Sequence, residues 1–210
     1  MSLFIPGPVG PLEAKLWKPK SGAPRAAAVM CHPHPLHGGT MNTTAVFRSA
    51  RGLEEAGLAV LRFNFRGVGK SAGVHDGKGG EELDLKAAID WMATEFPGVE
   101  LWAGGFSFGS RTLGSYASKD PRVKRILLVA LPVKVFDCSF LRGIKQPGMI
   151  LMAEHDEFGT LSELRELFPD LPPQLATDEI AGANHYFVSR TQELQARVRS
   201  WATDILANRT

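Results

Sequence analysis

One short stretch of this chain, Gly105-Phe106-Ser107-Phe108-Gly109, limits the possible folds more than any other. It spells G-x-S-x-G and stands between an apolar run over 99–103 and a segment over 110–119 with the composition of a helix. Glycine lacks a Cβ, so the glycines on either side of Ser107 allow a sharp reversal between a strand and a helix. Such a turn holds a serine hydroxyl at the end of a sheet, where a neighbouring base can activate it. The alternative is a glycine-rich turn with an incidental serine, so the remaining sequence must supply the base and its acid.

Composition favours one ordinary globular domain. Of the 210 residues, 44% are hydrophobic and 22% are charged, and no linker or repeat divides the chain, so we expect a single domain over 1–210. The net charge of +2, without long runs of lysine or arginine, argues against binding to nucleic acid or an anionic membrane. No stretch approaches the roughly 18 apolar residues of a membrane span, and no signal peptide is recognisable. The two cysteines, Cys31 and Cys138, are expected to be free thiols, so we expect a cytoplasmic protein.

Predicted strands and helices alternate from residue 26 onward, after a predicted opening hairpin over 3–5 and 12–17. Such alternation is typical of an α/β protein with a mostly parallel, twisted sheet covered by helices on both faces. The predicted strands span 26–31, 58–65, 99–103, 125–131, 148–153 and 174–180. Only a short segment lies between the strands that end at 131 and begin at 148, which argues against an inserted lid domain.

Three polar side chains follow three of these strands in the order serine, acid, histidine. Ser107 follows the strand over 99–103, Asp156 follows the strand over 148–153, and His185 follows the strand over 174–180. The carboxyl ends of parallel strands meet at one edge of a sheet, so we expect these side chains to lie together. A histidine can remove the proton that keeps a serine hydroxyl unreactive, and a carboxylate can orient that histidine. A histidine that only caps a loop remains the alternative for His185.

Four segments together make the chain resemble the α/β-hydrolase superfamily, and the resemblance runs from residue 12 to the C-terminus. These segments are His32-Pro-His-Pro-Leu-His-Gly-Gly39, Phe63-Asn-Phe-Arg-Gly-Val-Gly-Lys-Ser71, Gly105-Phe-Ser-Phe-Gly109 and Gly182-Ala-Asn-His185. The chain is similar to small, lidless bacterial serine hydrolases, a group that resembles dienelactone hydrolases and carboxylesterases. The resemblance implies the α/β-hydrolase fold, a catalytic triad of Ser107, Asp156 and His185, and no cofactor. Dienelactone hydrolases carry cysteine at the position of Ser107, so the serine favours ester or thioester chemistry here.

The family pattern also favours Asp156 over other acids, because its distance from the strand and its short side chain fit that pattern. Other carboxylates remain alternatives: Glu154 and Glu157 flank Asp156, and Asp137 and Asp178 are weaker candidates if the acid lies on another strand.

The resemblance further implies an oxyanion hole made by two backbone N–H groups. One belongs to Phe108, the residue directly after the serine, and the other to the loop after the first parallel strand. Pro33 and Pro35 in that loop carry no N–H group, so we assign the second donor to His34. Phe108 and Phe187 follow the serine and the histidine closely in sequence, and both are weaker candidates for the wall of a substrate pocket.

Two other patterns are compatible with ligand sites, but we do not expect them to bind ligands. The segment over 31–37 contains one cysteine and three histidines, but it has no zinc-binding spacing. Its prolines are expected to hold the loop extended, so that the histidines diverge and no metal is bound.

The Gly69-Lys70-Ser71 segment lacks the earlier glycine of a phosphate-binding loop, since Asn64 stands there. Arg66 and Lys70 could contact an acidic substrate, but solvated surface is the preferred interpretation.

The expected function is hydrolysis of a small-molecule carboxylic ester or thioester with a small or short acyl group, through an acyl-serine intermediate. A peptidase, an amidase or a lactone hydrolase could use the same residues, and transfer to an alcohol could replace hydrolysis. A non-catalytic binding module of the same fold is the alternative from a different class. A homodimer through an edge strand or helix is compatible with the pattern but not required by it.

Overall fold

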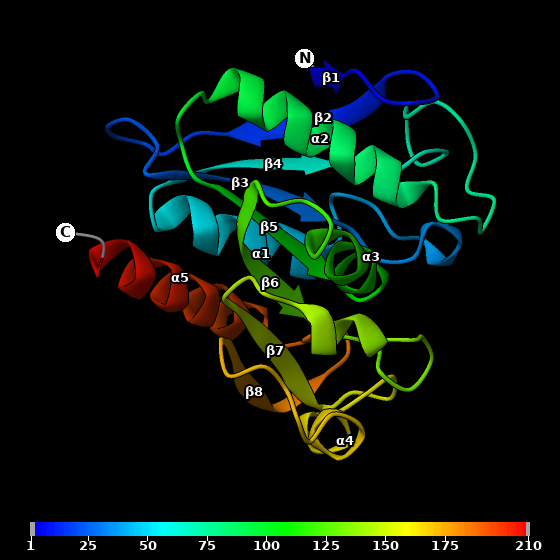
Figure 1. The fold of residues 1–210 in the computed structure, drawn as a ribbon, viewed down its shortest axis with the longest axis vertical. Helices are drawn as coiled ribbons and strands as arrows, with labels where there is room; N and C mark the ends of the chain where they lie inside the picture. The colour runs from blue at the N-terminus through cyan, green and yellow to red at the C-terminus, as the bar shows by residue number, and fades with distance from the viewer. Residues whose placement is uncertain (1–2, 209–210) are drawn as a thin grey trace.

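Within residues 3–208, the part of the chain that the computed structural model describes, eight strands form one sheet in the order β1-β2-β4-β3-β5-β6-β7-β8 (Figure 1). The strands are β1 (Leu3–Ile5), β2 (Leu12–Trp17), β3 (Ala26–Cys31), β4 (Leu58–Phe63), β5 (Leu101–Phe106), β6 (Val123–Val129), β7 (Gly148–His155) and β8 (Leu175–Asn184). Strand β2 pairs antiparallel with β1 and with β4, and all the other neighbours are parallel. The predicted opening hairpin and mostly parallel sheet are therefore confirmed.

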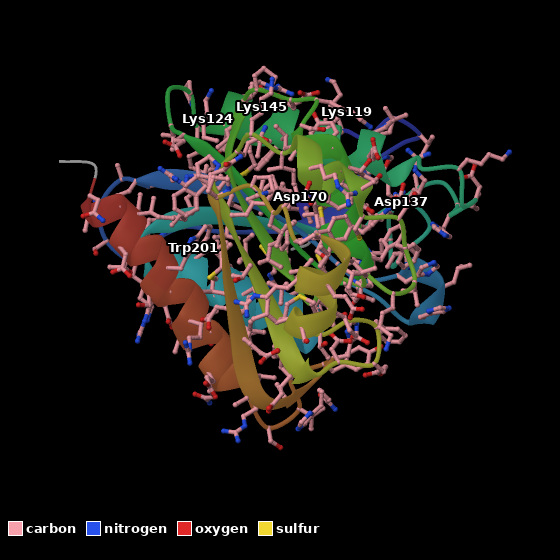
Figure 2. All side chains as sticks on the ribbon, turned by 60° about the horizontal axis from the view of Figure 1, so that its bottom comes forward. Lys119, Lys124, Asp137, Lys145, Asp170 and Trp201 are labelled. Carbon is pink, nitrogen blue, oxygen red and sulfur yellow. The ribbon has the colours of Figure 1, made fainter. Side chains whose placement is uncertain are left out.

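Helices cover both faces of the sheet, as expected for continuously apolar central strands. Every residue of β3, β4 and β5 is buried. One face packs against α1 (Thr44–Glu55) and α5 (Thr191–Ala207), and the other against α2 (Glu81–Glu95) and α3 (Phe108–Ala117). On the first face, the indole of Trp201 from α5, labelled in Figure 2, lies 5.3 Å from that of Trp102 in β5, measured between ring centroids. Two separate apolar cores therefore hold the sheet between helix layers.

The segment between β6 and β7 is short and carries only the 3-10 helix η2 (Ser139–Gly143). No lid domain is inserted between these strands, and the fold is the lidless α/β-hydrolase fold that the sequence predicted. The helices within residues 3–208 include none that combines the length and the apolar character needed to cross a bilayer.

Some boundaries differ from the sequence prediction, and two of the differences bear on the site. Strand β5 continues to Phe106, three residues beyond its predicted end, so it runs directly into the serine turn. Strand β8 likewise continues to Asn184, directly before the histidine. Helix α4 (Leu161–Leu167) was not predicted, although a capping box begins it: the Thr160 side chain accepts from the Glu163 N–H, and the Glu163 carboxylate accepts from the Thr160 N–H.

Candidate active site

Ser107 occupies the sharp turn between β5 and α3 with φ 54° and ψ −122°, a conformation that few side chains adopt. Its N–H donates to the Val129 carbonyl at 2.9 Å, which ties the turn to the end of β6. A Cβ added to Gly105 would lie 2.3 Å from the Gly109 carbonyl oxygen, and one added to Gly109 would lie 2.6 Å from that of Cys31. Both glycines are therefore required by close backbone approach, and the turn holds the Ser107 hydroxyl at the carboxyl edge of the sheet.

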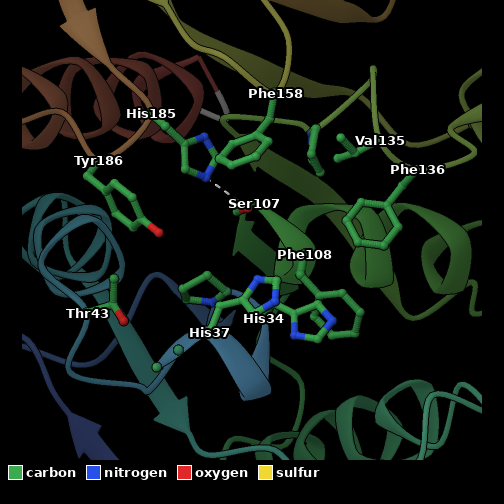
Figure 3. Close-up of a pocket in the computed structure, with 14 residues that line it drawn as sticks. His34, His37, Thr43, Ser107, Phe108, Val135, Phe136, Phe158, His185 and Tyr186 are labelled. Carbon is green, nitrogen blue, oxygen red and sulfur yellow. Dashed lines mark hydrogen bonds between the residues drawn. The ribbon is translucent and has the colours of Figure 1, made fainter.

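The three side chains expected at this edge are hydrogen-bonded in series. His185 Nε2 lies 3.0 Å from Ser107 Oγ (Figure 3), and His185 Nδ1 lies 2.8 Å and 2.9 Å from the two Asp156 carboxylate oxygens. The side chains of His185 and Asp156 are only 2% and 1% exposed. The Phe158 N–H donates to Asp156 Oδ1 at 2.9 Å and holds the carboxylate in place. This arrangement can draw a proton from the serine and stabilise the resulting imidazolium.

Aromatic rings fix the orientation of the His185 imidazole. Its ring centroid lies 4.6 Å from that of Phe158, 5.0 Å from that of Phe106 and 5.1 Å from that of Tyr186. These rings come from three different segments, and together they enclose the imidazole on the sides not occupied by the serine and the aspartate. The apolar enclosure limits water and strengthens the two hydrogen bonds of the ring.

The competing acid candidates lie elsewhere. Asp178 pairs with Arg197 at 3.0 Å, and the exposed Asp137 (Figure 2) caps its own loop by accepting from the Ser139 N–H. Neither these two nor the exposed side chains of Glu154, His155 and Glu157 make a hydrogen bond or ion pair with His185 in the described part of the chain. Asp156 is the acid that the fold brings to the histidine.

The two expected oxyanion donors border the same cavity as Ser107. His34 and Phe108 both line it, and within residues 3–208 neither backbone N–H donates a hydrogen bond to another residue.

The loop that carries His34 is anchored by the buried His32. The Phe65 N–H donates to His32 Nε2 at 3.0 Å, so the proton of the ring is on Nδ1, which donates to the Pro33 carbonyl at 2.6 Å.

Burial lowers the pKa of His32 to about 4, so the imidazole stays neutral in the folded protein. As the pH falls, the unfolded chain takes up this proton near pH 6.5, well before the folded protein does. Stability is therefore expected to fall between pH 6.5 and 4, by up to about 3 kcal/mol from this group alone. Urea unfolding of wild type and His32→Gln across this range measures the effect, because glutamine can form both hydrogen bonds but cannot titrate. The wild type should lose more stability than the variant, and equal losses would contradict this role of His32.

The cavity beside Ser107 has a volume of about 280 Å³, and its wall includes His37, Thr43, Val135, Phe136, Phe158 and Tyr186 (Figure 3). The prediction that Phe187 contributes to this wall is wrong. Phe187 is fully buried in the core beneath α1 and α5, and the half-exposed Tyr186 lines the cavity instead. The cause is a tight turn in which the Phe187 N–H donates to the Asn184 carbonyl and Phe187 adopts φ 54°, directing it toward the core.

Two expectations about neighbouring loops also need correction. The loop after β3 is not extended: Pro35 begins the 3-10 helix η1 (Pro35–His37), and the rings of His34 and His37 stack with their centroids 4.5 Å apart. Even so, within residues 3–208 there is no group of at least three His, Cys, Asp or Glu side chains placed to hold a metal ion.

The expectation that Arg66 lies on solvated surface is also wrong, because its guanidinium is buried against Asp84 with a shortest N–O distance of 2.7 Å.

Sequence reasoning missed two charged or polar groups that lie behind Phe108. His75 comes from the glycine-rich loop after β4, and its ring centroid lies 5.9 Å from that of Phe108. Arg111 comes from α3, one helical turn after the serine. The position of Arg111 in the helix was the only available signal, since nothing in the sequence indicates where the loop places His75.

Comparison with known proteins agrees with this fold. The family model described as the alpha/beta hydrolase fold matches residues 36–138. The chain is 32% identical to an uncharacterised protein of Rickettsia prowazekii, over 98% of this chain and 90% of the relative. Together with the two solved structures described next, each at least 30% identical over 95% of this chain, these matches show that the chain belongs to the α/β-hydrolase family.

Two solved structures share the fold closely. A homologue of alpha-beta serine hydrolases from Coxiella burnetii has a TM-score of 0.88 at 35% identity, covering 95% of this chain and 96% of its own. A serine hydrolase without a lid from Xanthomonas campestris has a TM-score of 0.86 at 30% identity, covering 95% of this chain and 92% of its own. The similarity supports assignment of the chain to the serine hydrolases of this family.

Proposed function

We propose that this protein hydrolyses carboxylic esters or thioesters, as carboxylesterases do, with Ser107 as nucleophile, His185 as general base and Asp156 as the orienting acid. The observation that carries the proposal is the pair of contacts made by one buried imidazole. Its Nε2 lies 3.0 Å from Ser107 Oγ, and its Nδ1 lies 2.8 Å from Asp156 Oδ2. A base within hydrogen-bond reach of the hydroxyl, itself held by a carboxylate, is what activation of a serine requires.

The proposed reaction proceeds in two stages. Ser107 Oγ attacks the acyl carbon while its proton passes to His185 Nε2, and the negative oxygen that develops is stabilised by the N–H groups of His34 and Phe108. The bond from carbon to the leaving oxygen or sulfur then breaks, and His185 returns the proton to the leaving group. Water then attacks the acyl carbon while His185 takes one of its protons, the bond from that carbon to Ser107 Oγ breaks, and His185 returns the proton to Oγ as the acid leaves. No cofactor is needed at any step.

The cavity supports a small substrate. Its volume of about 280 Å³ lies just below the range for small-molecule sites, roughly 300–1,000 Å³. Aromatic and aliphatic side chains, including Phe136, Phe158 and Val135, form much of its wall. We therefore propose short acyl groups or similarly small acids as substrates.

The test of this proposal is labelling with a fluorophosphonate together with hydrolysis of p-nitrophenyl esters of increasing acyl length. The native protein should bind one fluorophosphonate per chain, with the adduct located on Ser107 by mass spectrometry, and it should cleave acetate or butyrate faster than laurate. Denatured protein is the control, because loss of the Ser107–His185 contact should abolish labelling. Absence of labelling in the native protein would favour a non-catalytic module, and cleavage of long chains alone would contradict the substrate size.

We also propose that the protein works in the cytoplasm. Cys31 and Cys138 are both buried and free, and burial raises the pKa of both thiols. Unpaired structural cysteines of this kind suit a reducing compartment.

A further inference from the structure

A second cavity, of about 270 Å³, lies behind the proposed oxyanion hole. It shares His34, Phe108 and Phe136 with the cavity beside Ser107, so the two cavities are neighbours. The remaining wall is polar and comes from α2, α3 and the loop before α2. The side chains that line it include Arg111 and Thr112 of α3.

Two polar groups in this wall lack partners. Arg111 Nε is buried without a hydrogen bond, and within residues 3–208 its guanidinium makes no ion pair. Thr112 is 2% exposed, and its hydroxyl oxygen is also buried without a partner. A buried polar atom left unpaired is costly, and native proteins contain few of them. Six other buried polar atoms of the described chain also lack a hydrogen-bond partner, but Arg111 and Thr112 are adjacent in sequence and line the same cavity, which makes this wall a candidate ligand site.

The nearby carboxylates do not satisfy Arg111, because each is engaged by another side chain. Glu81 is 2.6 Å from His75 Nδ1, and Glu82 is 2.8 Å from the Lys119 ammonium group. Arg111 has no such contact in the described chain and remains available to an anion. The two carboxylates also limit the anion, since they would repel a doubly charged group such as phosphate more strongly than a single carboxylate.

The second cavity borders the turn that carries Ser107, because Phe108, the next residue, lines both cavities. The Arg111 backbone N–H donates to the Ser107 carbonyl at 3.1 Å, so the backbones of these two residues stand one helical turn apart, about 5.4 Å along the axis. His185 and Phe108 lie on opposite sides of Ser107 (Figure 3). The leaving oxygen must face His185 to receive its proton, so the arm of the substrate that passes Phe108 is the acyl arm.

We propose, on the basis of the proposed function, that this second cavity binds a carboxylate at the far end of the acyl group. The substrates are then half-esters or half-thioesters of short dicarboxylic acids. The Arg111 guanidinium pairs with the distal carboxylate, and the Thr112 hydroxyl donates a hydrogen bond to it. Arg111 and Thr112 thereby determine specificity, while Ser107 and His185 carry out the reaction.

The experiment compares mono-p-nitrophenyl glutarate with its methyl ester, which has the same acyl chain but no charge. Wild type should show a higher kcat/KM for the anionic substrate, by about 10- to 100-fold, the range for a hydrogen bond to a charged group. Arg111→Met should reduce this ratio at least tenfold, and Arg111→Lys should restore part of it. Arg165→Met, which removes an exposed arginine on α4, is the matched control and should keep the ratio. No preference in wild type, or an equal preference in Arg111→Met, would overturn the inference.

Binding of glutarate measured by calorimetry separates this inference from the proposed function, because it does not depend on turnover. Ser107→Ala should bind glutarate, and the double variant with Arg111→Met should not. If neither ester is cleaved but glutarate binds through Arg111, the proposed hydrolase function fails while the carboxylate site stands. If the esters are cleaved without preference and glutarate does not bind, only the carboxylate site fails. Arg111-dependent binding of inorganic phosphate that is tighter than that of glutarate would also overturn the inference. So would a charge preference found only on the leaving group, measured as a higher kcat/KM for 4-acetoxybenzoate than for phenyl acetate.

Discussion

Replacing Ser107 with alanine is expected to lower kcat for p-nitrophenyl acetate by about 10⁵- to 10⁶-fold, as loss of the nucleophile does in serine hydrolases. Alanine removes Oγ, so no acyl-serine can form and His185 Nε2 loses its 3.0 Å partner. The free N–H groups of His34 and Phe108 can still polarise an ester carbonyl, so a slow direct attack by water should remain. Initial rates at saturating ester, together with the amount of fluorophosphonate bound, measure the loss.

A stability comparison shows whether this loss comes from chemistry or from unfolding. Ser107 stands at φ 54° and ψ −122°, which costs alanine about 1–3 kcal/mol but costs glycine little. In urea unfolding, Ser107→Gly should therefore be more stable than Ser107→Ala by about 1 kcal/mol, with both variants folded and inactive. The control is Ser115→Ala on the same helix, whose hydroxyl donates only to Glu82; it should keep its activity. More than a hundredth of wild-type kcat in Ser107→Ala would contradict the assigned nucleophile.

The fold was predictable because its signals are local and repeated. Continuous apolar runs separated by helical stripes require a parallel sheet with both faces covered, and the structure has this sheet. The turn around Ser107 was predictable for a related reason, since only glycine fits the close backbone contacts at positions 105 and 109. The Thr160–Glu163 capping box was also a local signal for helix α4, but the helix was not predicted because its seven residues are too few to show a helical stripe.

The site divides into a part that follows from topology and a part that does not. Side chains directly after parallel strands must meet at one edge, so the serine, the acid and the histidine could be brought together from the sequence alone. Which side a loop residue faces depends on its backbone angles, and for this reason Phe187 was assigned to the pocket that Tyr186 lines. The grouping of His75 with Arg111 and Thr112 depends on how the long loop after β4 folds back, which no local pattern encodes.

Asp156→Asn is expected to lower kcat by about 10⁴-fold while the fold remains intact, because it places the histidine proton on the wrong nitrogen. Asp156 Oδ1 already accepts from the Phe158 N–H at 2.9 Å, so the asparagine oxygen should stay there and its NH₂ should replace Oδ2, 2.8 Å from His185 Nδ1. Nδ1 must then accept, so the proton moves to Nε2, which can no longer take the proton of Ser107. Steady-state hydrolysis measures the loss, and thermal unfolding shows that the variant is folded.

A second substitution at the same position separates the tautomer from the charge. Asp156→Ala also removes the carboxylate but leaves Nδ1 without an imposed donor, so it should retain more activity than Asp156→Asn. Asp178→Asn is the matched control, because Asp178 pairs with Arg197 on the surface and should be replaceable without loss of activity. A tenfold or smaller effect of Asp156→Asn, or a larger effect at Asp178, would show that another acid orients His185. The asparagine substitution therefore tests the direction of one hydrogen bond, between Asp156 and His185 Nδ1, on which the proposed proton transfer from Ser107 depends.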